Sequence, residues 1–149
     1  QRSRDPALAN AWLAVLMLDL DNLKAINDRY GHHMGSQTIH EVGQIIGKTV
    51  AGKGQGTRFG GDEFTVFLVG HDLNEARAVA EEIRGSVEDL LLLTEDDQPV
   101  RTTISIGVAV ATGVNLDHER LCRHADKALY RAKEGGRNQV AAWGEPSTS

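Results

Sequence analysis

Several features that define large classes of protein are scarce in this sequence. It has one cysteine, Cys122, so no disulfide can form within the chain, and a reducing compartment suits it. No apolar run reaches the roughly 18 residues of a membrane span, and no signal peptide is visible at the start, so we expect a cytoplasmic domain without membrane contact. Basic residues are outnumbered by acidic ones, 16 to 21, for a net charge of −5. That balance argues against nucleic-acid binding, which normally needs a basic face.

The rest of the composition is that of an ordinary globular domain. Hydrophobic residues make up 40% of the 149 residues and charged residues 25%. This length suits one domain with its own core and is too short for two comfortable ones. We therefore expect a single domain over residues 1–149, ending in a loose polar tail at about 143–149.

The spacing of apolar residues alternates between strand-like and helix-like along the chain. Residues 12–18, WLAVLML, form a continuous apolar run typical of a strand buried on both faces, and Asp21 is expected to cap a short helix over 22–30. The further expected elements are a helix around 39–50, extended segments at 57–59 and 64–69, a helix over 73–93, a strand over 100–110, a helix over 117–134 and a strand at 138–143. The order β-α-α-β-β-α-β-α-β predicts a central sheet with helices packed on it, in the α/β or α+β class.

Two pairs of acids lie where these elements end. Asp19 and Asp21 follow the first strand, and Asp62 and Glu63 occupy the turn of a hairpin expected at 60–63. Adjacent carboxylates repel one another, and hard divalent cations such as Mg²⁺ or Mn²⁺ prefer carboxylate oxygens. Neighbouring strand ends can bring the two pairs together around a metal. The alternative is that each pair consists of solvated turn acids without a metal.

Four motifs make the chain similar to a known family. They are LDLDNLKAINDRYGH at 18–32, RFGGDEF at 58–64, ISIGVAV at 104–110 and ADKALYRAKEGGRN at 125–138. Their order and spacing resemble the GGDEF domain of diguanylate cyclases over nearly the whole chain. That family joins two GTP molecules into cyclic di-GMP and releases two pyrophosphates. The resemblance implies a palm-like fold related to nucleotidyl cyclases and polymerases, with a central, mostly antiparallel sheet flanked by helices.

The resemblance assigns catalytic and metal-binding roles to the acids. Asp62 matches the family's proposed general base for the ribose 3′-hydroxyl, and Asp19 and Glu63 complete the catalytic acids. Two divalent ions per active site, Mg²⁺ or Mn²⁺, would be held by the side chains of Asp19, Asp62 and Glu63 and by the backbone carbonyl of Leu20.

A second set of residues is implied to bind the nucleotide. Asn27 matches the residue that recognises the guanine edge, and His32 matches a substrate contact nearby. The remaining contacts are implied to come from main-chain N–H groups at Asn22 and Leu23, the cations Lys133 and Arg137, and the glycines Gly60 and Gly61.

The sequence departs from the family's usual pattern in the base site. Where GHxxGD is common, residues 31–36 are GHHMGS, so Ser36 replaces an aspartate that accepts hydrogen bonds from guanine N1–H and the 2-amino group. Serine both donates and accepts, so it could tolerate adenine. At this position the chain resembles the hybrid promiscuous subset, which makes cyclic AMP-GMP from ATP and GTP. The expected product is therefore cyclic di-GMP, cyclic AMP-GMP or both, because bound water could also restore guanine recognition at Ser36.

Two further departures concern regulation. The family's product-inhibition motif, RxxD, aligns with AGKG at 51–54, so feedback at that site should be weak or absent. The family's usual DxLTGLxNR segment is missing before Asp19, so we expect a catalytic fragment of a longer protein with an upstream sensory or receiver domain. Because each of two nucleotides must attack the other, a homodimer is also expected.

Competing hypotheses come from other functional classes. GGDEF-like domains can be inactive receptors for cyclic di-GMP or GTP, but such receptors usually keep RxxD and lose the hairpin acids, the reverse of this chain. A purely structural dimerisation module would not need the full set of acids and cations. His118 and Cys122 have the spacing of two metal ligands on a helix, yet no further ligand completes a zinc set, so they are interpreted as ordinary helix residues.

Overall fold

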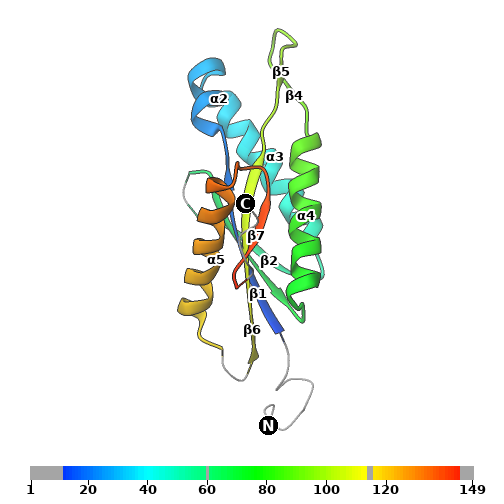
Figure 1. The fold of residues 1–149 in the computed structure, drawn as a ribbon. Helices are drawn as coiled ribbons and strands as arrows, with labels where there is room; N and C mark the ends of the chain where they lie inside the picture. Colours follow the sequence, from blue (N-terminus) through cyan, green and yellow to red (C-terminus); the bar gives the residue numbers. More distant parts are fainter. Residues whose placement is uncertain (1–11, 60, 114–115, 145–149) are drawn as a thin grey trace.

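The computed structural model describes residues 12–59, 61–113 and 116–144. Its main sheet has five strands in the order β2-β3-β1-β6-β7 (Figure 1). Every neighbouring pair is antiparallel except β6 and β7, which run parallel. The bounds are β1 Trp12–Leu20, β2 Gly54–Phe59, β3 Glu63–Val69, β6 Ile104–Thr112 and β7 Val140–Ala142. The prediction of a mostly antiparallel central sheet is confirmed.

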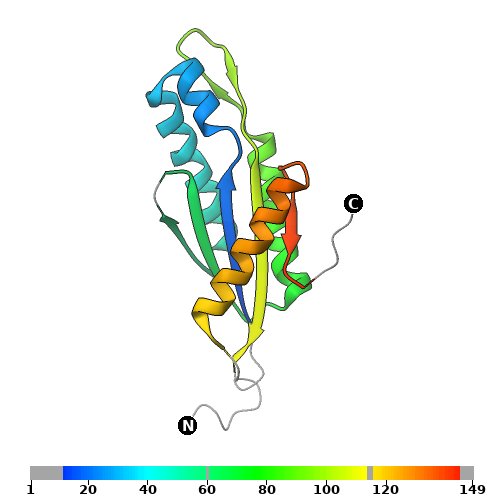
Figure 2. The same cartoon turned by 60° about the vertical axis from the view of Figure 1, so that its left-hand side comes forward.

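Helices cover both faces of this sheet. Figures 1 and 2 show α3 and α4 on one face and α5 on the other. The short helix α2 precedes α3, and Ile26 of α2 packs against Met34 at the start of α3. The bounds are α2 Leu23–Tyr30, α3 His32–Val50, α4 Leu73–Asp89 and α5 His118–Glu134. Among the described residues, no helix is both long enough and apolar enough to span a membrane.

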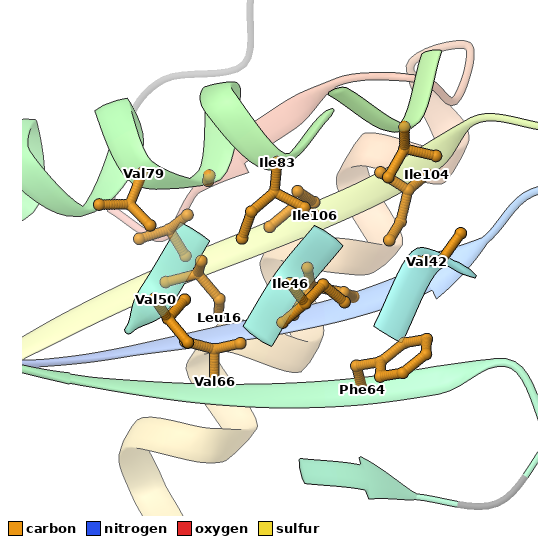
Figure 3. Close-up of a cluster of buried hydrophobic side chains, with 14 of the residues drawn as sticks. Leu16, Val42, Ile46, Val50, Phe64, Val66, Val79, Ile83, Ile104 and Ile106 are labelled. Atoms are coloured by element: carbon orange, nitrogen blue, oxygen red, sulfur yellow. The ribbon is translucent and has the colours of Figure 1, made fainter. Parts of the chain in front are cut away.

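The larger part of the core lies between the sheet and the pair α3 and α4. Figure 3 shows Leu16 of β1 among Ile46 of α3, Ile83 of α4 and Ile106 of β6. Alternate residues of β1 point the other way, where Val15 packs against Leu121 of α5. Strand β1 is therefore buried on both faces, which explains why its sequence is a continuous apolar run.

The structure differs from the sequence-based prediction after α4. The predicted helix over 73–93 ends instead at Asp89, and a two-stranded ribbon follows, with β4 at Leu92–Leu93 and β5 at Pro99–Val100. Leu92 and Val100 of this ribbon are buried against Ile26 and Met34. This tertiary packing ends the helix, because helix periodicity alone could have continued through the leucines.

The hairpin between β2 and β3 differs from the prediction in two ways: Glu63 belongs to a strand instead of the turn, and strand β2 is longer. Phe59 pairs with Glu63, so Glu63 belongs to β3, and Gly61 and Asp62 lie in the turn. Strand β2 starts at Gly54, earlier than expected, and a Cβ there would lie 1.9 Å from the carbonyl oxygen of Phe67. Glycine therefore allows β2 to approach β3 closely at this position. Gly60 and most of the predicted tail lie outside the described residues.

Candidate active site at the ends of three strands

The two acidic pairs meet where three strands of the sheet end side by side. Asp19 lies in register with Glu63 of β3 on one side and with Ser105 of β6 on the other. The Leu20 N–H donates to the carbonyl oxygen of Asp62 at 3.1 Å, which ties the hairpin turn directly to the end of β1. Sequence spacing could not show this convergence, because the two pairs are about forty residues apart.

A cavity of about 470 Å³ opens at this convergence. Its lining includes these residues predicted to bind metal or nucleotide: Asp19, Leu20, Asn22, Leu23, Asp62 and Arg137. Glu63 is exposed at the start of β3 and is not among the described residues that line the cavity. The structure thus brings most of the predicted phosphate and metal residues around one space.

Asp19 is the most constrained acid in this cavity. The residue is only 6% exposed, and its Oδ2 accepts a hydrogen bond from Nζ of Lys133. Its Oδ1 is buried and has no hydrogen-bond partner among the described residues. Burial raises the pKa of the Asp19 carboxyl; Lys133 opposes this shift, and the negative charge of Asp62 adds to it. A buried carboxylate oxygen without a partner suits a cation.

The donor set fits a hard divalent ion that shares its coordination with a substrate. Among the described residues, no group of three or more histidine, cysteine, aspartate and glutamate side chains is placed to hold a metal without further ligands. Asp19 and Asp62 line the same cavity, however, and Mg²⁺ commonly uses one or two protein carboxylates together with substrate phosphates. The arrangement fits such an ion, with a triphosphate supplying the missing oxygens.

Asp21 has a different role from the one predicted. Its carboxylate accepts hydrogen bonds from the hydroxyls of Thr103 and Ser105, both at 2.6 Å, and from the Asn138 N–H at 3.0 Å. The predicted helix cap at Asp21 is therefore wrong. The cap position is Asn22, whose side chain bonds Thr102 Oγ1 and the Arg101 carbonyl instead of the helix. The carboxylate of Asp21 has better partners around the start of β6 than in the helix that follows it.

The first turn of α2 lines the cavity. Leu23, Lys24 and Ala25 line the cavity, and the first N–H groups of a helix have no partner within the helix. These groups can donate to phosphate oxygens, as the sequence predicted for the Asn22 and Leu23 main chain. Arg137 also lines the cavity, and its Nη1 lies 3.9 Å from Asp21 Oδ1.

The residues predicted to recognise the base lie elsewhere. Ser36 is exposed and lines a second cavity of about 280 Å³, together with Arg58 and Phe64. Asn27 packs against Gly35, and its Oδ1 is buried without a hydrogen-bond partner in the described part of the chain. His32 is exposed at the start of α3.

The hairpin turn lies between the two cavities, which share no lining residue among those described. Gly61 has a φ of 39°, in the left-handed region that glycine adopts most readily, and its carbonyl accepts a hydrogen bond from Arg58 Nε at 3.1 Å. Arg58 thus links the turn beside Asp62 to the cavity of Ser36.

Sequence reasoning missed the residues that hold Asp21. Asn138 ends the last recognised motif, and Thr103 and Ser105 lie on either side of the first residue of β6, but no local pattern connects any of them with Asp21. Their partner is more than eighty residues away in the sequence, so only the sheet topology shows the connection.

Comparison with known proteins agrees with this geometry. Residues 2–139 match the family model described as diguanylate cyclase, GGDEF domain. Diguanylate cyclase DosC of Escherichia coli K12 is 40% identical over 131 residues, which cover 88% of this chain and 28% of DosC. The crystal structure of the GGDEF domain of DgcB from Caulobacter crescentus in complex with c-di-GMP superposes with a TM-score of 0.85 at 31% identity, covering 91% of this chain and 80% of that one.

A further similar structure contains a regulator. It is diguanylate cyclase SiaD of Pseudomonas aeruginosa in complex with its activator SiaC, with a TM-score of 0.83 at 27% identity, covering 95% of this chain and 53% of SiaD. The present chain thus spans less than a third of the length of DosC and about half of SiaD.

Proposed function

Because this chain belongs to the diguanylate cyclase GGDEF family, we propose that it condenses two nucleoside triphosphates into a cyclic dinucleotide. In this reaction each ribose 3′-oxygen attacks the α-phosphorus of the other nucleotide, and two pyrophosphates leave. One observation carries the proposal: the buried Asp19 has an unpartnered oxygen in a cavity that it shares with Asp62 and with the cation Arg137. Diguanylate cyclases of this family generally use divalent metals.

The acids of the site are proposed to have two roles, proton transfer and metal binding. Asp62 is proposed to take the proton of the 3′-hydroxyl, and Asp19, Asp62, Glu63 and the Leu20 carbonyl are proposed to hold two Mg²⁺ or Mn²⁺ ions. When bound, these ions would neutralise charge on the phosphates and on the leaving pyrophosphate. Glu63 is proposed on the family match alone, because the cavity lining supports Asp19, Leu20 and Asp62 more directly.

The cations and the start of α2 are proposed to hold the triphosphate. The Lys133 ammonium bonds Asp19, and because an ammonium has three donors it can also reach a phosphate oxygen. Arg137 lines the cavity with its side chain half exposed, so it can pair with a phosphate without being desolvated first. The N–H groups at Asn22 and Leu23 complete the phosphate contacts.

The identity of the base depends on the second cavity. Asn27, with its unpartnered Oδ1, is proposed to bond the base edge, with His32 nearby and Gly60 and Gly61 allowing the nucleotide to lie against the hairpin. Ser36 offers both a donor and an acceptor, so we propose that GTP is a substrate and that ATP is accepted as a second one. The products would be cyclic di-GMP and cyclic AMP-GMP.

The reaction requires two active sites facing each other. A nucleotide bound on one domain must be attacked by a nucleotide on another, so we propose a homodimer during turnover. The chain covers 28% of DosC and 53% of SiaD, and the SiaD structure contains an activator. Both facts support regulation by other segments or partners, which would control how two of these domains meet.

The receptor hypothesis has less support. Residues 51–54 are exposed and contain neither the arginine nor the aspartate of RxxD, so a high-affinity cyclic di-GMP site of that type lacks its ligands. Calorimetric titration with cyclic di-GMP separates the two hypotheses. Tight binding without turnover would favour the receptor.

The decisive experiment is mass spectrometry of the products formed with Mg²⁺ and GTP, ATP or both. Cyclic AMP-GMP from the mixture would mean that Ser36 relaxes base selection. Cyclic di-GMP alone in the presence of excess ATP would mean that guanine recognition survives through other contacts. No product at high protein concentration, with nucleotide still bound, would contradict turnover by this domain without its regulator.

A further inference from the structure

The turn that follows α5 has an unusual backbone. Arg137 and Asn138 are consecutive non-glycine residues with φ of 65° and 47°, in the left-handed region. Side chains disfavour this region, and such residues persist when surrounding contacts hold them there. Because Arg137 lines the phosphate cavity, the contacts that hold this turn also decide where its guanidinium lies.

Asn138 holds the turn with three hydrogen bonds to two distant parts of the chain. Its N–H donates to Asp21 Oδ2 at 3.0 Å. Its Nδ2 donates to Glu88 Oε2 at 2.7 Å, and its Oδ1 accepts from Arg84 Nη1 at 3.0 Å. Glu88 and Arg84 also bond each other, at 3.3 Å, and both belong to the last turns of α4. Both polar atoms of the Asn138 side chain thus have a hydrogen-bond partner near the C-terminal end of α4.

The same end of α4 reaches the other edge of the cavity. Arg101 Nη1 donates to the Glu88 carbonyl at 3.4 Å, and the Arg101 carbonyl accepts from the Asn22 side chain at 3.2 Å. Asn22 starts the helix α2 whose first turn lines the cavity. Glu88 therefore bonds Asn138, which follows Arg137, and it also bonds Arg101. Arg101 in turn bonds Asn22 at the start of α2.

We propose that Asn138 is a positioning residue for nucleotide binding, held in place by Arg84 and Glu88. Asn138 stabilises the left-handed turn that positions the Arg137 side chain, and its N–H bonds the carboxylate of Asp21. This inference rests on the proposed function, because it assumes that the cavity binds a triphosphate. The inference adds that α4 helps to position Arg137, the proposed phosphate-binding cation. Among the described residues, α4 contributes none to the cavity lining.

The first test is the affinity of the Asn138→Gly variant for 3′-deoxy-GTP with Mg²⁺, measured by calorimetry. This nucleotide lacks the attacking hydroxyl, so binding is measured without turnover. Glycine adopts the left-handed backbone readily, so the variant should fold while losing the two side-chain bonds. Losing hydrogen bonds to charged partners should weaken nucleotide binding about tenfold.

Asp72→Ala is the matched control. Asp72 caps the other end of α4 by accepting from the Glu75 N–H at 2.9 Å, so this change destabilises the same helix far from Asn138. We expect a lower melting temperature with unchanged affinity for 3′-deoxy-GTP. Equal loss of affinity in Asp72→Ala and Asn138→Gly would overturn the proposal, since general loosening of α4 would then explain both.

A pair of exchanges tests the specific contact with Glu88. Asn138→Asp should weaken binding more than Asn138→Gly does, because the introduced carboxylate would face that of Glu88. Adding Glu88→Gln to Asn138→Asp restores a donor opposite that carboxylate while Arg84 still donates, so affinity should recover to within about threefold of the original. Additive losses in the double variant would contradict the pairing.

The outcomes also separate this inference from the function on which it rests. If the unchanged protein binds 3′-deoxy-GTP and Asn138→Gly binds it equally well, only the positioning role fails. If the unchanged protein binds no nucleoside triphosphate in the presence of Mg²⁺, the proposed function fails and this inference fails with it.

Discussion

The proposed phosphate end and the proposed base end of the site are built differently. At the phosphate end, Asp19 bonds Lys133, and Asp21 accepts three hydrogen bonds, from two side-chain hydroxyls and one backbone N–H. At the base end, Ser36 and His32 are exposed, and Asn27 presents an unpartnered Oδ1. The first region is held from several elements at once, whereas the second depends on a few side chains on two consecutive helices.

This difference agrees with what each region is proposed to recognise. Every nucleoside triphosphate has the same phosphates, so the residues that bind them can be fixed by the core of the sheet. Bases differ, and an exposed residue such as Ser36 can change with little effect on stability. Under the proposed function, the fold would therefore allow the base of the substrate to change while the phosphate-binding residues stay the same.

The largest effect should come from Asp62→Asn at the phosphate end. Removing a general base should lower turnover by about a thousandfold, and the fold should persist because Asp62 lies in a turn. Pyrophosphate release measures turnover, and circular dichroism checks the fold.

Glu63→Gln is the comparison that sharpens the metal assignment. We expect turnover to be lost here as well if Glu63 binds metal as the family match implies. Activity close to that of the unchanged protein would remove Glu63 from the site and leave Asp19 and Asp62.

The second largest effect should be a loss of GTP affinity in the Gly35→Ala variant, because this change displaces Asn27 at the proposed base end. A Cβ at Gly35 would lie 1.7 Å from Asn27 Oδ1, so the amide must move. We expect GTP affinity to fall about tenfold through the lost hydrogen bonding. Gly47→Ala is the matched control on the same helix, because no atom lies within 4 Å of a Cβ there. Equal GTP affinity in the two variants would argue against a role for Asn27.

The third effect is a change of selectivity without loss of rate. Ser36→Asp supplies a carboxylate that can accept from guanine N1–H and the 2-amino group, so it should shift the preference toward GTP over ATP by about ten- to a hundredfold. The ratio of cyclic di-GMP to cyclic AMP-GMP, formed from equal GTP and ATP, measures the change. An unaltered ratio would place base selection elsewhere in the cavity lined by Ser36.

The smallest effect is a gain in stability at the phosphate end. Burial raises the pKa of Asp19 above its usual 3.8, so its charged form opposes folding at neutral pH. Asp19→Asn should raise the melting temperature at neutral pH by about 2–4 °C. The gain should disappear as the pH falls below 3.8, where the carboxyl is protonated in both folded and unfolded chains. A lower melting temperature at neutral pH would mean that the bond with Lys133 outweighs burial.

The sequence predicted the parts of the molecule that depend on local pattern. Strand β1 was predicted from its continuous apolar run and helix α5 from its apolar periodicity, and Asp117 caps α5 where that helix was predicted to begin. Helix α3 was predicted only from residue 39, whereas it begins at His32. The ribbon of β4 and β5 was missed because its leucines continue the apolar pattern of the preceding helix. Its strands form through burial against α2 and α3, which local periodicity cannot show.

The site shows the same division. The motifs predicted which residues would surround the cavity, and Asp19, Asp62 and Arg137 do so. The role of Asp21 was predicted wrongly, because its hydroxyl partners around the start of β6 come from a remote part of the sequence. Long-range hydrogen bonds of this kind depend on the strand order, which only the three-dimensional structure reveals.

The position of Lys133 and Arg137 near the end of the sequence has a consequence for biosynthesis. Arg137 lines the cavity together with Asp19 of the first strand, and Lys133, at the end of α5, bonds Asp19. On the ribosome, a nascent chain ending before residue 133 would display the acids without either cation. If the proposed function is correct, nearly the entire domain must therefore be translated before it can bind a nucleotide, and polypeptides that terminate early should make no cyclic dinucleotide.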